Sequence, residues 1–418
     1  HRDLHSFPTR RSSDLPGWDN VRIAQLGEIV SGGTPSTTVP GYWDGVIPWV
    51  TPSDVTSLHA KIITESKKKI TSQGLSSSSA KLLPIGSLLV TTRATIGACC
   101  LAGKPLTTNQ GFKSIIPEDK TYPDFYYHYL TNSVRNLEKR AIGSTFKEIS
   151  KQEFENIYVL HPPKSEQIAI AAILDTVDEA IRRTEVLIAK LRQVKAGMLQ
   201  DLLTRGLDEN GELRDPIRHP EQFKDSLLGR IPAAWDICPL MAFATLQRGF
   251  DITVAEQKTG NIPVVSSSGI TSYHNKAAVS GPGVVIGRKG KLGGAYFLEG
   301  PFWPHDTSLW VKNFHGNDEK FAAIFLKFLR LERFDAATSV PTLNRNAIHP
   351  ILIGIPGKSE QISIVKHIEK NEKTVRMEAT FLNKLITIKQ GLMQDLLTGR
   401  VRVPEAMLPK YQTEVAAA

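Results

Sequence analysis

The sequence is poor in cysteine and has no long apolar run. Its three cysteines are Cys99, Cys100 and Cys238, and the first two are adjacent. This spacing suits neither a disulfide framework nor a zinc site, so we interpret them as small hydrophobic residues in a reducing compartment. No uncharged apolar stretch reaches the roughly 18 residues that a membrane-spanning helix needs. We therefore expect a cytoplasmic protein without a membrane segment.

Sequence motifs for catalysis are also missing. The chain has no G-x-x-x-x-G-K-[ST] phosphate loop, no glycine-rich methyl-donor loop, no Asn-Pro-Pro-aromatic segment and no H-E-x-x-H pair. Two weaker patterns remain. Residues 52–54 and 65–67 resemble the Asp…Glu-x-Lys metal site of many nucleases, although "TESKKK" is explained more simply as a solvated basic turn. His305 beside Asp306 suits a general base, but no nucleophile accompanies them. We expect no catalytic residue and no metal ligand.

The composition that is present is basic and globular. Lys and Arg number 51 against 42 Asp and Glu, which gives a formal net charge of +9. This excess indicates a polyanionic partner such as nucleic acid, although mildly basic proteins without one are common. With 418 residues and 41% hydrophobic residues, the chain suits two or three domains that have their own cores.

One segment of the sequence occurs twice. Residues 164–204 and 358–398 align over 41 positions without an insertion, and 16 of these positions are identical. Neither copy contains Pro, and Ser165 and Ser359 are expected to cap the first N–H groups. Equal length with relaxed sequence indicates that a distance is being held fixed.

Both copies have the periodicity of a long helix. At alternating three- and four-residue steps, seven of nine positions in the first copy and six of nine in the second are apolar. These positions are Leu174, Val177, Ile181, Thr184, Ile188, Leu191, Lys195, Met198 and Leu202, and then Ile368, Asn371, Val375, Glu378, Leu382, Leu385, Lys389, Leu392 and Leu396. Heptad spacing of this kind predicts the seam of a coiled coil, in helices roughly 60 Å long at 1.5 Å per residue.

Each helix follows a longer segment of another character. Residues 18–161 and 235–355 are rich in Gly, Pro, Ser, Thr and β-branched residues, which predicts short strands with tight turns and one helix each. Both segments begin at a Trp and share landmarks but little else. These are "GVIPWVTPSDV" (45–55) with "GNIPVVSSSGI" (260–270), Arg93 to Gly97 with Arg288 to Gly293, and "GSTFKEIS" (143–150) with "SVPTLNRN" (339–346).

The expected fold class is therefore α+β, with two β-rich α/β domains separated by two long helices. The expected boundaries are a disordered or foreign N-terminal tail at 1–17, a domain at 18–161, a helix at 162–204, a linker at 205–234, a second domain at 235–355, a second helix at 356–399 and a C-terminal tail at 400–418.

This layout resembles the specificity subunit of type I restriction–modification systems. The resemblance is carried by "GGTPS" (32–36), "YWDGVIPWVTPSD" (42–54), "TTNQGF" (107–112), "PPKSEQIAIAAILDTVDEAI" (162–181) and "GLMQDLLTGRVRV" (391–403). In order and duplicated, these motifs cover nearly the whole chain outside the termini. The second domain departs from the pattern, because it carries "QRGFDI" and "PHDTSL" (304–309) in place of "GGTPS" and "NQGF".

The resemblance implies a division of labour between subunits. Two target-recognition domains would each read one half of an asymmetric, split site in double-stranded DNA, and the helices between them would pair antiparallel. Two methyltransferase subunits would dock on those helices, and restriction subunits that translocate and cut DNA would join the complex. S-adenosylmethionine, ATP and Mg would then bind the partner subunits, with no cofactor in this chain.

The candidate DNA-binding residues are those whose side chains can read base edges or hold phosphates. Arg reads guanine and Asn or Gln reads adenine through paired hydrogen bonds, while Lys, Ser and Thr suit phosphates. In the first domain the candidates are Thr92, Arg93, Asn109, Gln110, Lys113, Ser144, Thr145 and Lys147. In the second they are Arg288, Lys289, Lys291, Asp306, Thr307, Ser308, Asn344 and Arg345.

Other functions stay open at this point. A specificity subunit of a methyltransferase-only or fused type II-like system would have the same layout. A self-contained restriction endonuclease would need a catalytic domain, and a coiled-coil adaptor would not need two large basic domains.

Overall fold

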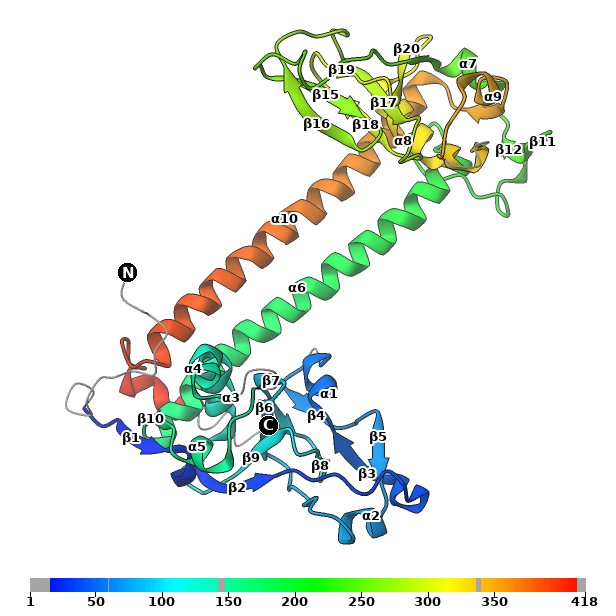
Figure 1. Ribbon diagram of the computed structural model, residues 1–418. Coiled ribbons are helices and arrows are strands. Elements are labelled where there is room, and N and C mark those ends of the chain that lie inside the picture. The colour runs from blue at the N-terminus through cyan, green and yellow to red at the C-terminus, as the bar shows by residue number, and fades with distance from the viewer. Residues whose placement is uncertain (1–15, 59, 142–146, 336–339, 412–418) are drawn as a thin grey trace. The chain divides into compact units, whose positions relative to one another are not determined.

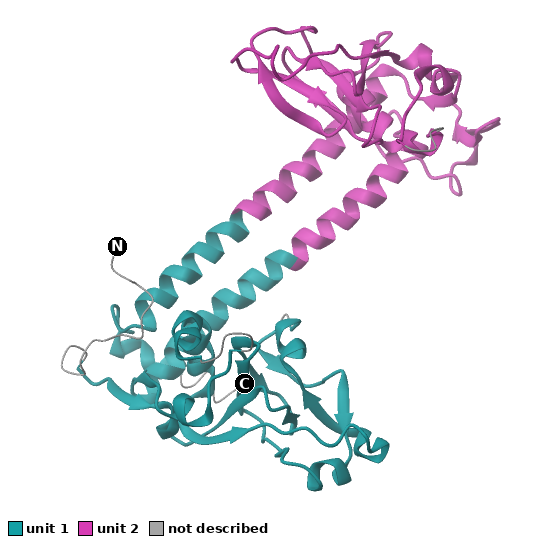
Figure 2. Ribbon diagram, viewed as in Figure 1, with its two compact units in different colours: residues 1–185, 381–418 teal, residues 186–380 magenta. Residues whose placement is uncertain are grey.

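The computed structural model describes residues 16–58, 60–141, 147–335 and 340–411. The chain divides into two compact units (Figure 2). Unit 1 holds the residues up to 185 and those from 381 onward, and unit 2 holds residues 186–380. Nearly all of the tail expected at 1–17 lies outside the described residues.

Unit 1 contains a mixed sheet with helices packed on it (Figure 1). Its strands are β1 (Asp19–Arg22), β2 (Gly27–Ser31), β3 (Trp43–Val50), β4 (Ile62–Ile63), β5 (Lys68–Ile70), β6 (Leu88–Arg93), β7 (Thr95–Ala102), β8 (Thr107–Thr108), β9 (Phe112–Pro117) and β10 (Tyr158–His161). Its shorter helices are η2 (Ile23–Gln25), η3 (Pro40–Tyr42), α1 (Pro52–Thr56), α2 (Ser72–Ser76), α3 (Pro123–Asn132), α4 (Val134–Arg140), α5 (Lys151–Glu155) and η6 (Glu405–Met407).

Strand β6 lies at the centre of this unit. Its run of apolar and Thr residues is buried from Leu88 to Thr92, as expected for a strand covered on both faces. Helix α3 begins at Pro123, a residue whose fixed φ suits the first helical turn. It packs Phe125, Tyr126 and other aromatic residues into the same core as β6. Fully burying one such side chain stabilises the fold by about 1.5–3 kcal/mol.

Unit 2 is built in the same way. Its strands are β11 (Phe223–Ser226), β12 (Gly229–Pro232), β13 (Asp236–Pro239), β14 (Thr245–Arg248), β15 (Ile262–Ser266), β16 (Gly269–His274), β17 (Gly283–Gly287), β18 (Ala295–Leu298), β19 (Trp303–Pro304), β20 (Ser308–Asn313) and β21 (Leu352–Ile355). Its shorter helices are η4 (Pro220–Gln222), α7 (Leu240–Phe243), α8 (Glu319–Phe328), η5 (Leu331–Phe334) and α9 (Arg345–Ile348).

The two units share one strand topology despite their unlike sequences. The main sheet of unit 1 has the order β2-β9-β6-β7-β4, and that of unit 2 has the order β14-β20-β17-β18, which repeats it without the last strand. A second sheet repeats as β5-β3-β8 and β16-β15-β19. In both units the first and last strands of the domain pair with each other, β1 with β10 and β13 with β21.

The two long helices follow the predicted seam. They are α6 (Lys164–Thr204) and α10 (Lys358–Leu396), and each contributes residues to both units (Figure 2). All eighteen seam positions are buried or half-buried, so the heptad prediction is confirmed. Because the helices start at Lys164 and Lys358, Ser165 and Ser359 lie inside the first turn and not at the capping position, which corrects that expectation.

Within each unit the helices run antiparallel. In unit 1, Asp178 pairs with Lys389 at 2.5 Å, while Glu166, earlier on α6, pairs with Arg402, later in the chain than Lys389. In unit 2 the order is again opposed, since Lys195 pairs with Glu372 at 2.5 Å and Leu207 with the earlier Glu360.

The start of each long helix is held by a cluster of three side chains, which we name the Trp–Glu–Arg clusters. In unit 1, the buried Glu166 accepts hydrogen bonds from Trp18 Nε1 at 2.8 Å and from Arg402 Nε and Nη2 at 2.7 and 2.6 Å. In unit 2, Glu360 accepts from Trp235 Nε1 at 3.1 Å and from Arg214 Nη1 and Nη2 at 2.6 and 3.0 Å. A buried carboxylate needs such a partner to keep its charge.

The neighbouring glutamines complete the attachment. The Gln167 amide donates to the Pro162 carbonyl at 2.7 Å and accepts from the Tyr122 N–H at 2.8 Å. The Gln361 amide donates to Pro356 and accepts from Asp318, both at 2.9 Å. The repeated phrase "KSEQ" therefore marks the point where each helix is attached to its domain.

Two further features concern the linker and the membrane. The segment 205–234, interpreted as a linker, contains the hairpin β11–β12 and the buried Arg214, so it carries ordered structure of its own. Among the described residues no helix is both long and apolar enough to span a bilayer.

Candidate nucleic-acid interface

In unit 1 the fold brings three separate predicted segments together at the end of β6. The Thr92 N–H donates to the Gly111 carbonyl at 2.8 Å, the Ile149 N–H donates to Thr92 at 2.9 Å, and the Ala94 N–H donates to Lys147 at 3.3 Å. The Arg93 turn, the Asn109–Gln110 loop and the segment after residue 146 are thus neighbours. Their proximity could not be read from sequence spacing.

The Arg93 side chain forms an ion pair within the protein. Its Nε lies 3.6 Å from Glu148 Oε2, and Lys113 Nζ lies 3.8 Å from Glu148 Oε1. Lys113 is buried, and this desolvation lowers the pKa of its ammonium group. Glu148 opposes that shift and Arg93 adds to it. Arg93, with 45% of its side chain exposed, remains available to a ligand.

A second polar group comes from the "GGTPS" loop. The Thr34 hydroxyl donates to Gln110 Oε1, and Asn109 Oδ1 accepts from the Gly111 N–H at 3.0 Å. The loop can lie this close only because Gly32 has no side chain, since a Cβ there would be 1.9 Å from the Asn109 carbonyl oxygen. The Gln110 amide is therefore held beside Thr34, and the Asn109 amide is held on the backbone of its own loop.

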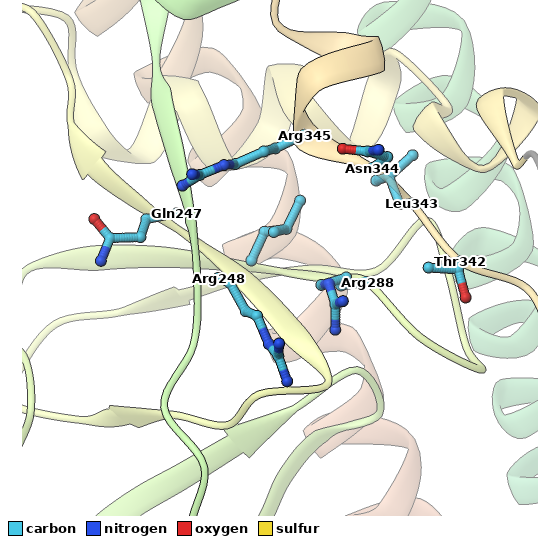
Figure 3. Close-up of a pocket in the computed structure, with 8 residues that line it drawn as sticks. Gln247, Arg248, Arg288, Thr342, Leu343, Asn344 and Arg345 are labelled. Atoms are coloured by element: carbon cyan, nitrogen blue, oxygen red, sulfur yellow. The ribbon is translucent and has the colours of Figure 1, made fainter.

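In unit 2 the corresponding surface is rich in arginine. A pocket of about 620 Å³ is lined by Arg248, Arg288, Arg345 and neighbouring residues (Figure 3). The other lining residues are Gln247, Leu309, Thr342, Leu343 and Asn344. Three guanidinium groups around one open pocket give an anion-binding surface of the kind that DNA phosphates and guanine edges require.

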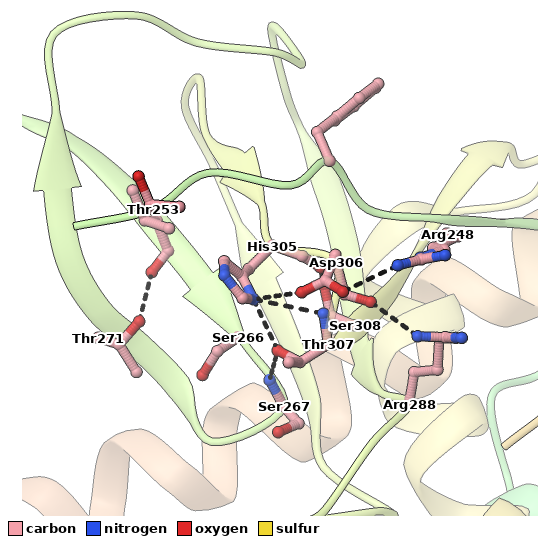
Figure 4. A network of polar contacts seen from close by, with 12 residues as sticks. Arg248, Thr253, Ser266, Ser267, Thr271, Arg288, His305, Asp306, Thr307 and Ser308 are labelled. Carbon is pink, nitrogen blue, oxygen red and sulfur yellow. Dashed lines mark hydrogen bonds and ion pairs between the residues drawn. The ribbon is translucent and has the colours of Figure 1, made fainter. Parts of the chain in front are cut away.

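Two of these arginines contact one residue. Arg248 Nη2 donates to Asp306 Oδ2 at 2.9 Å, and Arg288 Nη1 donates to the Asp306 backbone carbonyl at 3.0 Å (Figure 4). His305 Nδ1 lies 3.1 Å from Asp306 Oδ1 and 2.9 Å from Thr307 Oγ1. Asp306 is thus the centre of a polar network.

The two surfaces rest on the same backbone hydrogen-bond pattern. In unit 1 it consists of Thr92 to Gly111, Ile149 to Thr92, Ala94 to Lys147, Asn109 to Val50 and Gly33 to Thr108, donor first. In unit 2 it consists of Arg288 to Thr307, Leu343 to Arg288, Gly290 to Pro341, His305 to Val265 and Phe250 to Pro304. Residues that occupy the same place in this pattern are called matched below.

Matching by hydrogen bonds revises the alignment made from sequence. Arg93 is matched by Lys289 and not by Arg288, whose place is that of Thr92, and Glu148 is matched by Thr342. Asn109 and Gln110 are matched by His305 and Asp306. Gly32 is matched by Gly249, where a Cβ would lie 2.1 Å from the His305 carbonyl oxygen. The same loops therefore carry different side chains in the two units.

Comparison with known proteins agrees with this duplicated architecture. A family model described as the type I restriction modification DNA specificity domain matches residues 16–193 and 234–387. The chain belongs to this family.

Individual relatives cover the chain to different extents. It is 32% identical over 224 residues to the type I restriction enzyme MjaIX specificity subunit of Methanocaldococcus jannaschii, covering 53% of this chain and half of that protein. It is 23% identical over 421 residues to the MjaVIII specificity subunit of the same organism, covering 92% and 93%.

Solved structures show the same fold. The S subunit of a type I restriction-modification system from M. genitalium matches with a TM-score of 0.56 and 16% identity, over 94% of this chain and 99% of that chain. The HsdS subunit from Thermoanaerobacter tengcongensis matches with a TM-score of 0.53 and 15% identity, over 92% and 98%.

In this member of the type I DNA specificity family, several predicted site residues are placed with their side chains open to solvent. Arg93, Gln110, Lys147, Lys289, Lys291 and Arg345 are exposed, and Asn109, Arg288, Asp306 and Thr307 are half-buried. Ser144 and Thr145 lie outside the described residues. The DNA contacts themselves stay predictions.

Other predicted residues have structural roles. Thr92 and Ser308 are fully buried, and the Ser308 hydroxyl donates to the His305 carbonyl at 2.7 Å. Asn344 caps α9 by accepting from the Asn346 N–H at 3.0 Å. A direct base contact by these side chains would require their present hydrogen bonds or packing to break.

Sequence reasoning missed Thr34, Glu148, Gln247 and Arg248. Thr34 lies in "GGTPS" and Arg248 lies in "QRGFDI", two segments that take the same place in the first and second domains. That correspondence could have identified both residues as site candidates. Glu148 gave no such signal, because its partner Lys113 is 35 positions away and the contact depends on the sheet (Glu148 − Lys113 = 148 − 113).

The nuclease-like pattern has another explanation in the structure. Asp54 belongs to the first turn of α1, where its Oδ2 accepts from the Thr51 N–H at 2.8 Å and from the Thr51 hydroxyl. Glu65 instead pairs with Lys69 and Lys104, which lower the pKa of its carboxyl through hydrogen bonds, with Lys104 the larger cause. Asp54 Oδ1 also accepts from the Lys67 N–H at 3.3 Å, so the two segments are neighbours, but the carboxylates of Asp54 and Glu65 have different hydrogen-bond partners.

Proposed function

We propose that this chain is the DNA-recognition subunit of a type I restriction–modification complex, with each unit reading one half of an asymmetric bipartite site. The observation that carries the proposal is the pair of matched loop surfaces, which share a backbone pattern and differ in side chains. Asn109 and Gln110 suit adenine, whereas the arginines of unit 2 suit guanine. Two domains that share a fold but present different side chains would recognise two different half-sites, which accounts for an asymmetric target.

Catalysis is assigned to partner subunits. We infer that two methyltransferase subunits dock on α6 and α10, and that restriction subunits join through the complex. Exposed apolar side chains on these helices support docking, among them Val194 at 57%, Met377 at 62% and Phe381 at 50% exposure. Such residues on a helix that is not covered indicate a protein interface. S-adenosylmethionine, ATP and Mg would bind those partners.

A purified complex tests the proposal. The chain would be purified together with its cognate methyltransferase subunit, and adenine methylation of genomic DNA would be mapped by single-molecule sequencing. We expect methylation at one asymmetric site with an unread spacer. The control is the double variant Arg248→Ala, Arg288→Ala, which removes two guanidinium groups of the unit 2 pocket and should abolish or relax recognition of one half-site. Methylation without sequence preference would contradict the proposal.

Two other measurements address the alternatives. DNA cleavage by the isolated chain would support a self-contained endonuclease. A complex isolated from the native cell that methylates the site but contains no restriction subunit would indicate a methyltransferase-only or type II-like system.

A further inference from the structure

The carboxylate of Asp306 places a negative charge on the surface that is expected to bind DNA. Its Oδ2 pairs with the Arg248 guanidinium, Arg288 donates to the backbone carbonyl of the same residue, and the Asp306 side chain is 22% exposed. A carboxylate at a DNA surface is repelled by phosphates and weakens sequence-independent binding. Its presence therefore calls for a reason other than affinity.

Stability does not supply that reason. Arg248 has 57% of its side chain exposed, and ion pairs of this exposure contribute little to folding. The fold itself also forms without a carboxylate at this place, because the matched residue of unit 1 is the neutral Gln110, within the same backbone pattern. The side chain at this position is thus free to differ between the two domains.

Asp306 instead fixes the orientation of two arginine side chains. Its carboxylate holds Arg248 at 2.9 Å while its backbone carbonyl holds Arg288 at 3.0 Å, so one residue orients two guanidinium groups (Figure 4). An arginine fixed on a protein acceptor presents its remaining N–H groups in one geometry, which base recognition needs and phosphate binding does not. Freed from this contact, Arg248 would be able to bind any nearby phosphate.

We propose that Asp306 is a positioning residue that sets the specificity of the second domain by holding Arg248 in its base-reading orientation. The inference rests on the proposed DNA-recognition function. Asp306 raises discrimination between the target half-site and other sequences, and it lowers the affinity for DNA of any sequence. In the first domain the matched position is held by Gln110, whose neutral amide is bound to Thr34.

Asp306→Asn tests this inference, because the variant keeps the shape and the backbone carbonyl but removes the charge. The complex with its methyltransferase subunits would be assayed for binding to four duplexes, namely the methylated site, the site with one half scrambled, the site with the other half scrambled, and the site with both halves scrambled. We expect discrimination at one half-site to fall about tenfold or more, the size of one lost base contact, while discrimination at the other half is unchanged. Affinity for fully scrambled DNA should rise at low salt.

The matched control is Asp251→Asn. Asp251 belongs to the same carboxylate and histidine group as Asp306, is exposed, and has no hydrogen bond to an arginine among the residues that the structure describes. It should raise affinity for scrambled DNA in the same way but leave discrimination intact. Equal losses in the two variants would show that charge alone matters and would overturn the positioning role.

A double-variant cycle with Arg248→Ala separates positioning from a direct contact. If Asp306 acts through Arg248, the double variant should discriminate no worse than Arg248→Ala alone. Additive losses would overturn the inference. Full discrimination in Asp306→Asn would do so as well, whereas a wild-type complex that binds all four duplexes equally would instead contradict the proposed function.

Discussion

Single side chains at the two surfaces are held by protein acceptors before any DNA is present. Arg93 lies against Glu148 in unit 1, as Arg248 and Arg288 lie against Asp306 in unit 2. Residue type was enough to predict Arg93, Arg288 and Asp306 as site candidates. It was not enough to predict their acceptors, or that Thr92 and Ser308 turn into the core, because both depend on which strands become neighbours.

Arg93→Ala should weaken binding by about 1–3 kcal/mol and relax preference at one base pair of one half-site, as expected for a lost arginine–guanine contact. The measurement is binding of the complex to duplexes that vary at each position. Lys147→Ala is the control, since an exposed lysine that contacts phosphate should weaken all duplexes alike. If Arg93→Ala behaves like that control, Arg93 is a phosphate contact.

The apolar seam of the long helices could be predicted from the sequence, but the contacts that attach each helix to its domain could not. Periodicity predicts α6 and α10 from sequence alone, because heptad spacing is local. The Trp–Glu–Arg clusters join Glu166 to a tryptophan 148 residues earlier and an arginine 236 residues later, and no local pattern records such pairs. The two clusters differ in the solvent exposure of their arginines, since Arg214 has 8% of its side chain exposed and Arg402 has 39%.

Arg214→Ala should therefore destabilise unit 2 by about 3–5 kcal/mol, because the guanidinium that it removes is itself buried and Glu360 is left with only the neutral donors of Trp235 and Leu207. Arg402→Ala should cost unit 1 only about 1–3 kcal/mol, since water can reach Glu166 once the guanidinium is gone. Hydrogen exchange of peptides at the start of α6 and of α10, followed by mass spectrometry, measures each effect separately. A larger loss of protection in Arg402→Ala than in Arg214→Ala would contradict this account.

The polar group at Asp175 predicts a pH dependence for unit 1. Burial alone would raise the pKa of Asp175, but His128 and Lys61 lower it below its usual value of 3.8. Burial likewise opposes the raised pKa of Lys61, which Asp124 and Asp175 lift above 10.5. Asp175 contributes stability above about pH 4 that is lost as the pH falls, and Lys61 contributes stability below about pH 10.5 that is lost as the pH rises.

Asp175→Asn should therefore lower the free energy of unfolding between these limits, and the difference from wild type should shrink as the pH falls below about 4. Denaturant titrations at several pH values provide the measurement. Glu185→Gln, on an exposed face of the same helix, is the control and should show no such trend. A difference that stays constant down to acid pH would contradict the ion-pair explanation.

For the whole molecule, the repeated topology predicts independent readers. Replacing residues 18–161 with the first domain of a relative should change one half of the DNA target and leave the other unaltered, because each domain carries its own matched loops. Methylome sequencing of cells that express the chimera would show the outcome. Changes in both half-sites would mean that the domains do not read independently.

Helix length should set the spacing of the target. One extra heptad after Ile188 and one after Leu382 preserve the seam and add about 10 Å at 1.5 Å per residue. Because a DNA turn of 10–10.5 base pairs takes about 34–36 Å, the unread spacer should grow by up to about three base pairs. Both half-site sequences should stay as they were. A lengthened protein that folds and still methylates the original spacing would exclude this role.

The Trp–Glu–Arg cluster of unit 1 can form only late in the synthesis of the chain. Trp18 and Glu166 leave the ribosome early, but Arg402 follows Glu166 by 236 residues. At about 5–20 residues per second, that interval lasts on the order of ten to fifty seconds. Met393, Leu396 and Leu397, which pack into the core of unit 1, arrive equally late. The half of the protein that is translated first is therefore the last to be completed, and until then its core lacks the side chains from the end of the chain.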